Sequence, residues 1–189
     1  MKANLKSIAL VLVAFVTFTA TAQTTKKVNV EKSKLHWVGK KVTGQHEGTI
    51  KLKDGAVVLK GKKLVGGNFT VDMTSISTTD LQGDMKAKLD GHLKAEDFFG
   101  VEKFPTSTLV FKKIADKGNN VYTVYGELTI KGITQDINFD LTVNNNSASG
   151  KLIIDRTKFG IKYGSGSFFS DLGDRTIYDE FELDVTLSF

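Results

Sequence analysis

The chain of 189 residues contains no cysteine and a single proline. Without cysteine it can form no disulfide, no thiolate metal site and no lipid-modified cysteine, so a folded domain must depend on its own core. Only three histidines are present, His36, His46 and His92, and they form no HxH or HxxxH pair. We therefore expect no metal site and no cofactor. A G-x-S-x-G nucleophile motif is also absent, so no catalytic residue is assigned.

Long runs of one charge are missing as well. The 26 basic and 21 acidic side chains are interspersed, and the net charge is +5. A solvated surface explains this pattern better than nucleic-acid binding does, so we expect no nucleic-acid partner.

The chain has one long apolar run, and it lies at the N-terminus. Residues 8–18 are apolar, Lys2 and Lys6 precede them, and the small residues Ala20-Thr21-Ala22 follow. The run is too short to span a membrane, and the order is that of a secretory signal peptide cleaved near Ala22. A buried N-terminal helix is the alternative. We expect a signal peptide (1–22), one domain (23–189), a periplasmic or secreted protein, and no stable membrane insertion.

Most of the remaining chain alternates between apolar and polar residues. In residues 133–143, Ile133, Ile137, Phe139, Leu141 and Val143 share one face. Such a period of two predicts antiparallel strands with one buried face. About eight strands can close into a barrel, which is either filled by side chains or holds one small ligand. The expected strands are 34–39, 46–52, 56–60, 64–73, 106–114, 121–130, 133–143, 149–155 and 177–189, and Phe181 is expected on the inward face of the last one. Hairpin turns are expected at residues 54–55 and 131–132, and a frayed segment at 24–27.

One segment, residues 80–105, breaks the alternation. Apolar residues recur there at three- and four-residue spacing, which predicts a helical insert over about residues 80–99. Thr79 is a candidate N-cap with Gln82 as its capping-box partner, and Gly91 is expected to end the first part of the helix. The stripe expected to face the core comprises Leu81, Met85, Leu89, His92 and Leu93.

Motifs along nearly the whole of 23–189 resemble the YceI family. They are Gly91-His92-Leu93-Lys94, Asp97-Phe98-Phe99 and Phe104-Pro105-Thr106 in the insert, and elsewhere Trp37, Gly44-Gln45-His46-Glu47-Gly48, Gly66-Gly67-Asn68-Phe69, Asp72-Met73-Thr74-Ser75-Ile76, Gly126–Gly132 and Arg156-Thr157-Lys158-Phe159-Gly160. Gly100 departs from the acidic residue expected there. The resemblance implies an all-β, antiparallel, eight-stranded lipocalin-like barrel that is hollow and binds a polyisoprenoid without any reaction.

For such a barrel, we expect a long amphiphile, an isoprenoid quinone or a polyprenyl phosphate, as the partner. Its tail would contact an apolar lining formed by Phe69, Val71, Met73, Leu93, Phe98, Phe99, Phe111, Ile137, Phe139 and Leu141. Its headgroup would contact His92, Arg156 and Tyr163, with Asp72, Lys158 and Arg175 as further candidates. The sequence leaves a monomer and a homodimer both open.

Two other functions remain open at this point. In the first, the barrel is filled by side chains and serves a structural or stress-response role without a ligand. In the second, the protein is an enzyme that acts on a bound lipid through His92 together with Asp90 or Asp97. The residues themselves favour a simpler role for His92, a half-buried imidazole that holds the insert to the barrel through a hydrogen bond.

Overall fold

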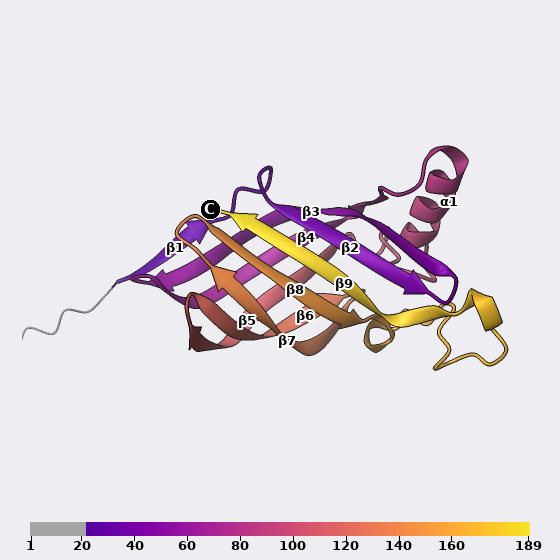
Figure 1. Cartoon of the computed structure of the whole chain (residues 1–189). Helices are drawn as coiled ribbons and strands as arrows, with labels where there is room; N and C mark the ends of the chain where they lie inside the picture. Colours follow the sequence, from indigo (N-terminus) through magenta and orange to yellow (C-terminus); the bar gives the residue numbers. More distant parts are fainter. Residues whose placement is uncertain (1–21) are drawn as a thin grey trace, which may run out of the picture.

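The structure is a computed structural model that describes residues 22–189, so the predicted signal peptide lies almost wholly outside the described residues. Within that range the chain forms nine strands, one α-helix and two 3₁₀ turns (Figure 1). The elements are β1 (Gln23–Lys27), β2 (Lys34–Lys41), β3 (Gly44–Lys60), β4 (Lys63–Thr78), α1 (Gly83–Lys94), β5 (Thr106–Gly118), β6 (Val121–Ile130), β7 (Ile133–Val143), β8 (Ser147–Asp155), η1 (Arg156–Phe159), η2 (Gly173–Arg175) and β9 (Ile177–Ser188).

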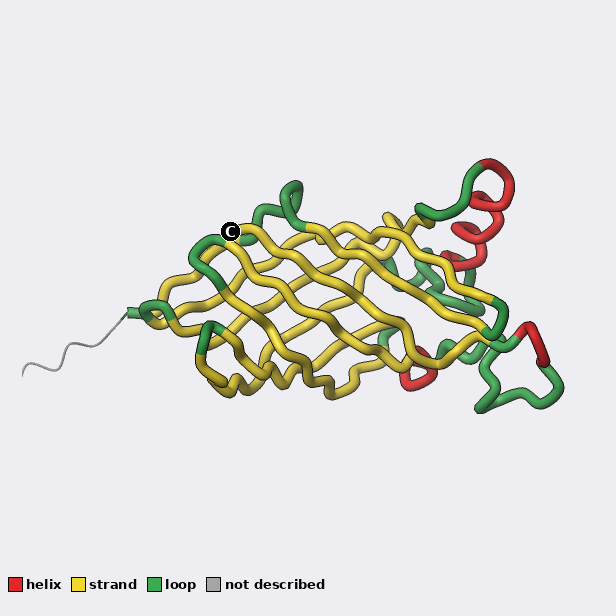
Figure 2. The backbone as a smooth tube through the Cα atoms, viewed as in Figure 1, coloured by secondary structure: helices red, strands yellow, loops and turns green. Residues whose placement is uncertain are grey.

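Eight of these strands, β2 to β9, close into an antiparallel barrel. The order around the ring is β3-β2-β9-β8-β7-β6-β5-β4, and β4 pairs back onto β3. The predicted fold class, an eight-stranded antiparallel barrel with a helical insert, is confirmed. Figure 2 shows that long loops and helical turns gather at one end, which we call the α1 end, while short hairpins join strands at the other.

The expected turn at residues 54–55 was wrong, because β3 runs unbroken from Gly44 to Lys60. The strand is irregular there instead, and its pairing with β4 shifts register between Leu52 and Asp54. A Cβ on Gly55 would lie 2.6 Å from the ring of Phe69, so this glycine permits close packing of two strands rather than a reversal.

The expectation for residues 24–27 was also wrong. They belong to β1, which pairs with residues 56–60 of β3. Strand β2 pairs with β3 only as far as Ile50, so the second half of β3 would otherwise present an unpaired edge. Strand β1 covers that edge, and the contact joins segments about thirty residues apart, beyond the reach of local sequence patterns.

The helix α1 differs from its prediction at both ends. Its N-cap is Gln82, whose side chain makes no capping hydrogen bond, while the amide of Thr79 donates to the carbonyl of Glu47 at 2.9 Å. Gly91 lies inside the helix, which continues to Lys94. Met85 is 62% exposed whereas Leu93 is buried, so only the C-terminal half of the expected stripe packs against the core. Among the described residues, no helix has the length and apolar character needed to cross a bilayer.

Candidate ligand-binding cavity

An apolar cavity lies inside the barrel. The volume open to the centre of a water molecule is about 160 Å³, on the order of ten times what one water needs. Every strand from β2 to β9 contributes to its wall, together with Leu93 of α1 and the Phe98-Phe99 pair that follows. The nearly continuous apolar wall suits a hydrocarbon better than a polar solute.

The burial of inward-facing side chains varies around the ring. Val57 and Val124 are fully buried, whereas Phe181, Leu183 and Val185 of β9 are only partly buried although they line the cavity. An inward side chain that keeps accessible surface borders open space. The bore is therefore hollow beside β9.

The structure places the predicted tail-lining residues as follows. Nine of them line the cavity: Phe69, Val71, Met73, Leu93, Phe98, Phe99, Phe111, Phe139 and Leu141. Ile137 does not. Strand β7 pairs with β8 only over Leu141–Val143, and the first part of β7 instead contacts η1, where Gln135 donates to the carbonyl of Lys158 at 3.2 Å. Ile137 therefore lies in a part of β7 that borders η1, and it packs on the core outside the cavity.

Two aromatic groups form much of the wall. Phe111 contacts Phe69 and Phe139, with ring centroids 5.4 Å and 6.0 Å away. Phe99 contacts Phe98 and Phe181, at 5.2 Å and 6.4 Å. The prediction did not assign Phe181 to the lining, although the alternation of the last strand placed it on the inward face. Other lining residues that the prediction did not assign include Leu35, Trp37, Ile50, Leu52, Leu109, Leu128, Leu183 and Val185.

Arg156 is the one predicted headgroup residue that reaches the cavity wall. It is buried, and its guanidinium donates to the carbonyls of Ile161 (2.9 Å), Ile177 (3.0 Å) and Tyr178 (3.1 Å). Burial lowers the pKa of Arg156, while the carboxylate of Asp179, 3.7 Å away, acts in the opposite direction. Main-chain carbonyls thus occupy most of its donors, which ties η1 to the start of β9.

His92 and Tyr163 lie outside the cavity lining and contact each other. Their ring centroids are 4.4 Å apart, and His92 also packs against Phe98 at 5.5 Å. The Nδ1 atom of His92 is 3.9 Å from a carboxylate oxygen of Asp97, and its buried Nε2 has no hydrogen-bond partner within the described chain. The expected hydrogen bond from His92 is therefore replaced by aromatic packing. Asp72, Lys158 and Arg175 do not line the cavity either.

The arrangement around Asp90 bears on the catalytic alternative. Its carboxylate accepts from the ammonium of Lys86 at 2.7 Å and from the amide of Thr78 at 2.7 Å. Partial burial alone would raise the pKa of Asp90, but these hydrogen bonds, with one from Ser77, lower it to about 2. The ionised Asp90 therefore holds α1 to β4, and within the described residues no hydrogen bond or ion pair joins it to His92. Within residues 22–189, no cluster of three or more His, Asp or Glu side chains is placed to hold a metal.

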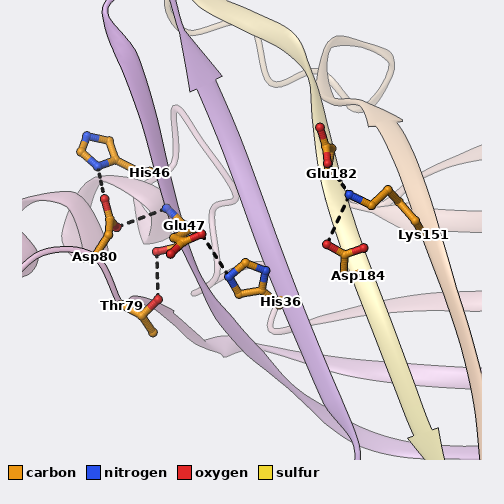
Figure 3. Close-up of polar contacts among 8 residues, drawn as sticks. All are labelled: His36, His46, Glu47, Thr79, Asp80, Lys151, Glu182 and Asp184. Atoms are coloured by element: carbon orange, nitrogen blue, oxygen red, sulfur yellow. Dashed lines mark hydrogen bonds and ion pairs between the residues drawn. The ribbon is translucent and has the colours of Figure 1, made fainter.

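The remaining histidines lie in outward-facing polar contacts (Figure 3). His46 bonds Asp80 at 2.8 Å, and His36 lies 3.5 Å from Glu47. On the neighbouring strands Lys151 contacts both Glu182 and Asp184. Hydrogen bonds from Lys151 and Lys40 lower the pKa of Glu182 to about 2. None of these residues lines the cavity. Their contacts are ion pairs on the outer surface of the barrel.

A closed eight-stranded antiparallel barrel around an apolar cavity is a lipocalin-like architecture. A family model, the YceI-like domain, matches residues 26–189, and the chain belongs to that family. Among solved structures, BcnA of Burkholderia cenocepacia superposes with a TM-score of 0.69 at 29% identity, covering 85% of this chain and 98% of that one. A polyisoprenoid binding domain from Saccharophagus degradans superposes at 0.57, with 13% identity over 85% and 95% of the two chains.

Curated relatives match over a shorter stretch. A UPF0312 protein of Staphylococcus aureus (strain USA300) is 36% identical over 85 residues, which is 39% of this chain and 47% of that protein. A UPF0312 protein of Pseudomonas putida (strain W619) is 30% identical over 86 residues, or 41% and 45%. The chain thus spans about half the length of these curated relatives.

Proposed function

We propose that this protein binds a polyisoprenoid, such as an isoprenoid quinone or a polyprenyl phosphate, inside its barrel and carries or stores it without catalysing a reaction. The observation that carries the proposal is the apolar cavity, which all eight barrel strands line. The Saccharophagus degradans domain, named as polyisoprenoid binding, has the same fold and supports the choice of ligand.

The driving force is the burial of the tail. Apolar surface removed from water contributes on the order of 25 cal/mol per Å². Two aromatic clusters line the cavity, one centred on Phe111 and the other on Phe99. A tail that lies between them would exchange contacts with water for contacts with aromatic and aliphatic side chains. The headgroup would then lie at an end of the bore, and Arg156 is the cationic side chain that lines the wall.

The proposal includes the compartment. A signal peptide cleaved near Ala22 would deliver residues 23–189 outside the cytoplasm, where a water-insoluble lipid needs a carrier between membranes. The N-terminus of the purified protein, read from its intact mass, tests this part separately from lipid binding.

Native mass spectrometry of the protein purified from its own compartment tests the ligand. We expect an adduct that survives gentle ionisation and that organic extraction releases as a polyprenyl lipid. A matched sample of Val71→Trp, with a bulky ring in the bore, should carry less of it. If the wild-type protein carries no lipid and takes up none from detergent, the barrel is a ligand-free structural one and the proposal fails.

A further inference from the structure

Large apolar side chains are exposed on three separate segments at the α1 end. These segments are the end of β2 with the β2–β3 turn (41–43), the start of α1 (82–85) and the connection from η1 to β9 (160–176). Figure 1 shows the last connection projecting beyond the ends of β2 and β3, while α1 stands out to the side of the barrel on the other side of the β2–β3 turn. The side chains are Val42 (51% exposed), Met85 (62%), Tyr163 (48%), Phe168 (47%) and Phe169 (50%).

The backbone that carries the two phenylalanines is fixed. The amides of Phe168 and Phe169 both donate to the carbonyl of Ser165, at 3.2 Å and 3.0 Å, and Ser165 is fully buried. The hydroxyl of Ser167 bonds Asp179 at 2.6 Å, and the amide of Ile177 bonds the carbonyl of Gly164 at 2.8 Å. The fold thus holds two adjacent aromatic rings outward, at the cost of leaving apolar surface in water.

The projecting connection begins and ends beside the cavity wall. Tyr178 is half exposed and lines the cavity, and Arg156 bonds the carbonyls of Ile161 and Ile177, which flank the projecting connection. Tyr163 packs on His92, so the connection and α1 contact each other through these two rings. A surface that receives this end therefore lies next to the cavity.

Charge favours an uncharged apolar surface as the occupant. The three segments carry Lys41, Lys162 and Arg175 against Asp84, Asp171 and Asp174, so their formal charges cancel. The ammonium of Lys162 lies over the ring of Phe168, 4.6 Å from its centroid, so a cation that could contact polar headgroups lies beside the two phenylalanines. Aromatic residues on projecting turns suit the boundary between headgroups and acyl chains.

We propose that the α1 end docks on a lipid bilayer by inserting Phe168 and Phe169 into its interfacial layer, with Val42, Met85 and Tyr163 around them. This contact would place the cavity beside the phase from which an apolar ligand comes. The docking extends the proposed lipid binding, but it does not depend on the identity of the ligand.

Vesicle flotation tests the docking. We expect the purified protein to float with vesicles of phosphatidylcholine alone, to a similar extent in low and high salt. Phe168→Ser combined with Phe169→Ser should lower the bound fraction by roughly tenfold or more. The matched control is Val65→Ser with Tyr125→Ser, two side chains of similar exposure (41% and 44%) on the barrel wall, and it should bind like wild type.

A second measurement reports insertion directly. Tryptophan in Phe169→Trp should be quenched by brominated acyl chains, whereas tryptophan in Tyr125→Trp should not, after subtraction of the buried Trp37 signal. Equal quenching, or no effect of the double serine variant, would overturn the docking.

Electrostatic binding through the opposite end of the barrel is the alternative mode of membrane binding. Lys60 and Lys62 lie there without a carboxylate partner in the described residues, and they would bind anionic vesicles. Binding that requires phosphatidylglycerol and disappears in high salt would therefore refute docking through the aromatic side chains. Lipid extraction of the same samples distinguishes the two proposals. Vesicle flotation of a protein that contains no bound lipid would refute only the carrier role. Bound lipid in a protein that does not float would refute only the docking.

Discussion

The indole of Trp37 occupies the space that Gly48 leaves on the inner wall. Trp37 and Gly48 are paired across β2 and β3, and a Cβ on Gly48 would lie 2.5 Å from the indole and 2.1 Å from the carbonyl of Ser77. The indole of Trp37 covers the position where Gly48 has no side chain, so the wall is continuous there and the bore stays open. At this scale the size of each inward residue decides whether the barrel is hollow, because an inward side chain has either a packed neighbour or open space in front of it.

Phe139→Ala tests whether that space exists. Phe139 lines the cavity, so removing its ring enlarges an existing space rather than creating one. The loss of unfolding free energy in the lipid-free protein should be smaller than the roughly 3–5 kcal/mol of a core Phe→Ala change. Denaturant titration of the delipidated protein measures the loss. Lipid binding should weaken in parallel.

Val71→Trp applies the opposite change at the same wall. In a hollow barrel the indole enters the bore, so the fold stays near wild-type stability while lipid uptake is lost. A filled barrel predicts overpacking and a loss of ~1–3 kcal/mol or more. Unfolding of this variant, together with a full core-deletion penalty for Phe139→Ala, would refute the hollow barrel.

Asp90 gives a pH-dependent contribution with a defined sign. Its pKa is lowered in the folded protein from a usual value near 3.8 to about 2, so folding stabilises the ionised form. That stabilisation is present above about pH 4 and is lost as the pH falls towards 2. Asp90→Asn should therefore lose less stability than wild type between pH 4 and pH 2, measured by denaturant titration at each pH. Asp84→Asn is the control, because Asp84 on the same helix forms no ion pair within residues 22–189, and its stability should vary with pH as in wild type. The same pH dependence in all three proteins would contradict the stabilising role of ionised Asp90.

At the scale of the elements, strand pairing and helix docking decide the structure. The helix α1 is held to β4 at Lys86 and Asp90, and it packs on the core through Leu89 and Leu93, whereas Met85 is exposed. The adjoining ends of β3 and β4 are held by contacts that leave no room for a side chain at Gly48. Glycine thus serves different purposes in the two elements: close approach between strands at Gly48, and no packing purpose at Gly91, where a Cβ would meet nothing within 4 Å.

Alanine at these two glycines should act in opposite directions. Gly48→Ala forces the β4 backbone or Trp37 to move, so we expect a loss of roughly 1–3 kcal/mol or more. Gly91→Ala removes a flexible residue from a helix interior and should stabilise by about 0.5–1 kcal/mol. Thermal and denaturant unfolding of both variants measure the difference. A neutral Gly48→Ala would mean that the strands are further apart there.

At the scale of the whole molecule, ring closure and burial are coupled. Pairing of β4 back onto β3 removes the open edges of the sheet, and it encloses the apolar faces of all eight strands. Because the barrel encloses these apolar faces without filling the space between them, some inward side chains have no packing partner. A ligand that supplies the missing contacts binds only the folded barrel, so ligand binding and folding stability are linked.

Bound lipid should therefore raise the unfolding free energy of the whole domain. For a ligand at a hundredfold excess over Kd the increase is about 2.7 kcal/mol. Differential scanning calorimetry of delipidated protein with increasing amounts of a polyprenyl lipid measures it, with Val71→Trp as the variant that should not respond. Unchanged melting of the wild-type protein across the series would count against a ligand in the bore.

The sequence alone determined the local geometry of this protein. Alternation with a period of two sets which face of a strand points inward, and it placed Phe139, Leu141 and Phe181 on the barrel interior correctly. It also predicted the hairpin at Lys131-Gly132 and the position of the helical insert. These features depend on residues within one strand or turn, so local physical chemistry is sufficient to predict them.

The tertiary structure decided what depends on contacts between distant segments. Such features are the pairing of β1 with β3, the unbroken course of β3 past Gly55, and the short pairing of β7 with β8 where Ile137 lies outside the cavity. The burial of Arg156 under three carbonyls and the outward position of Phe168 follow from how the last connection folds over the barrel end. The period of a strand fixes a side chain's direction, but only the closed ring decides whether another side chain, open space or solvent lies in that direction.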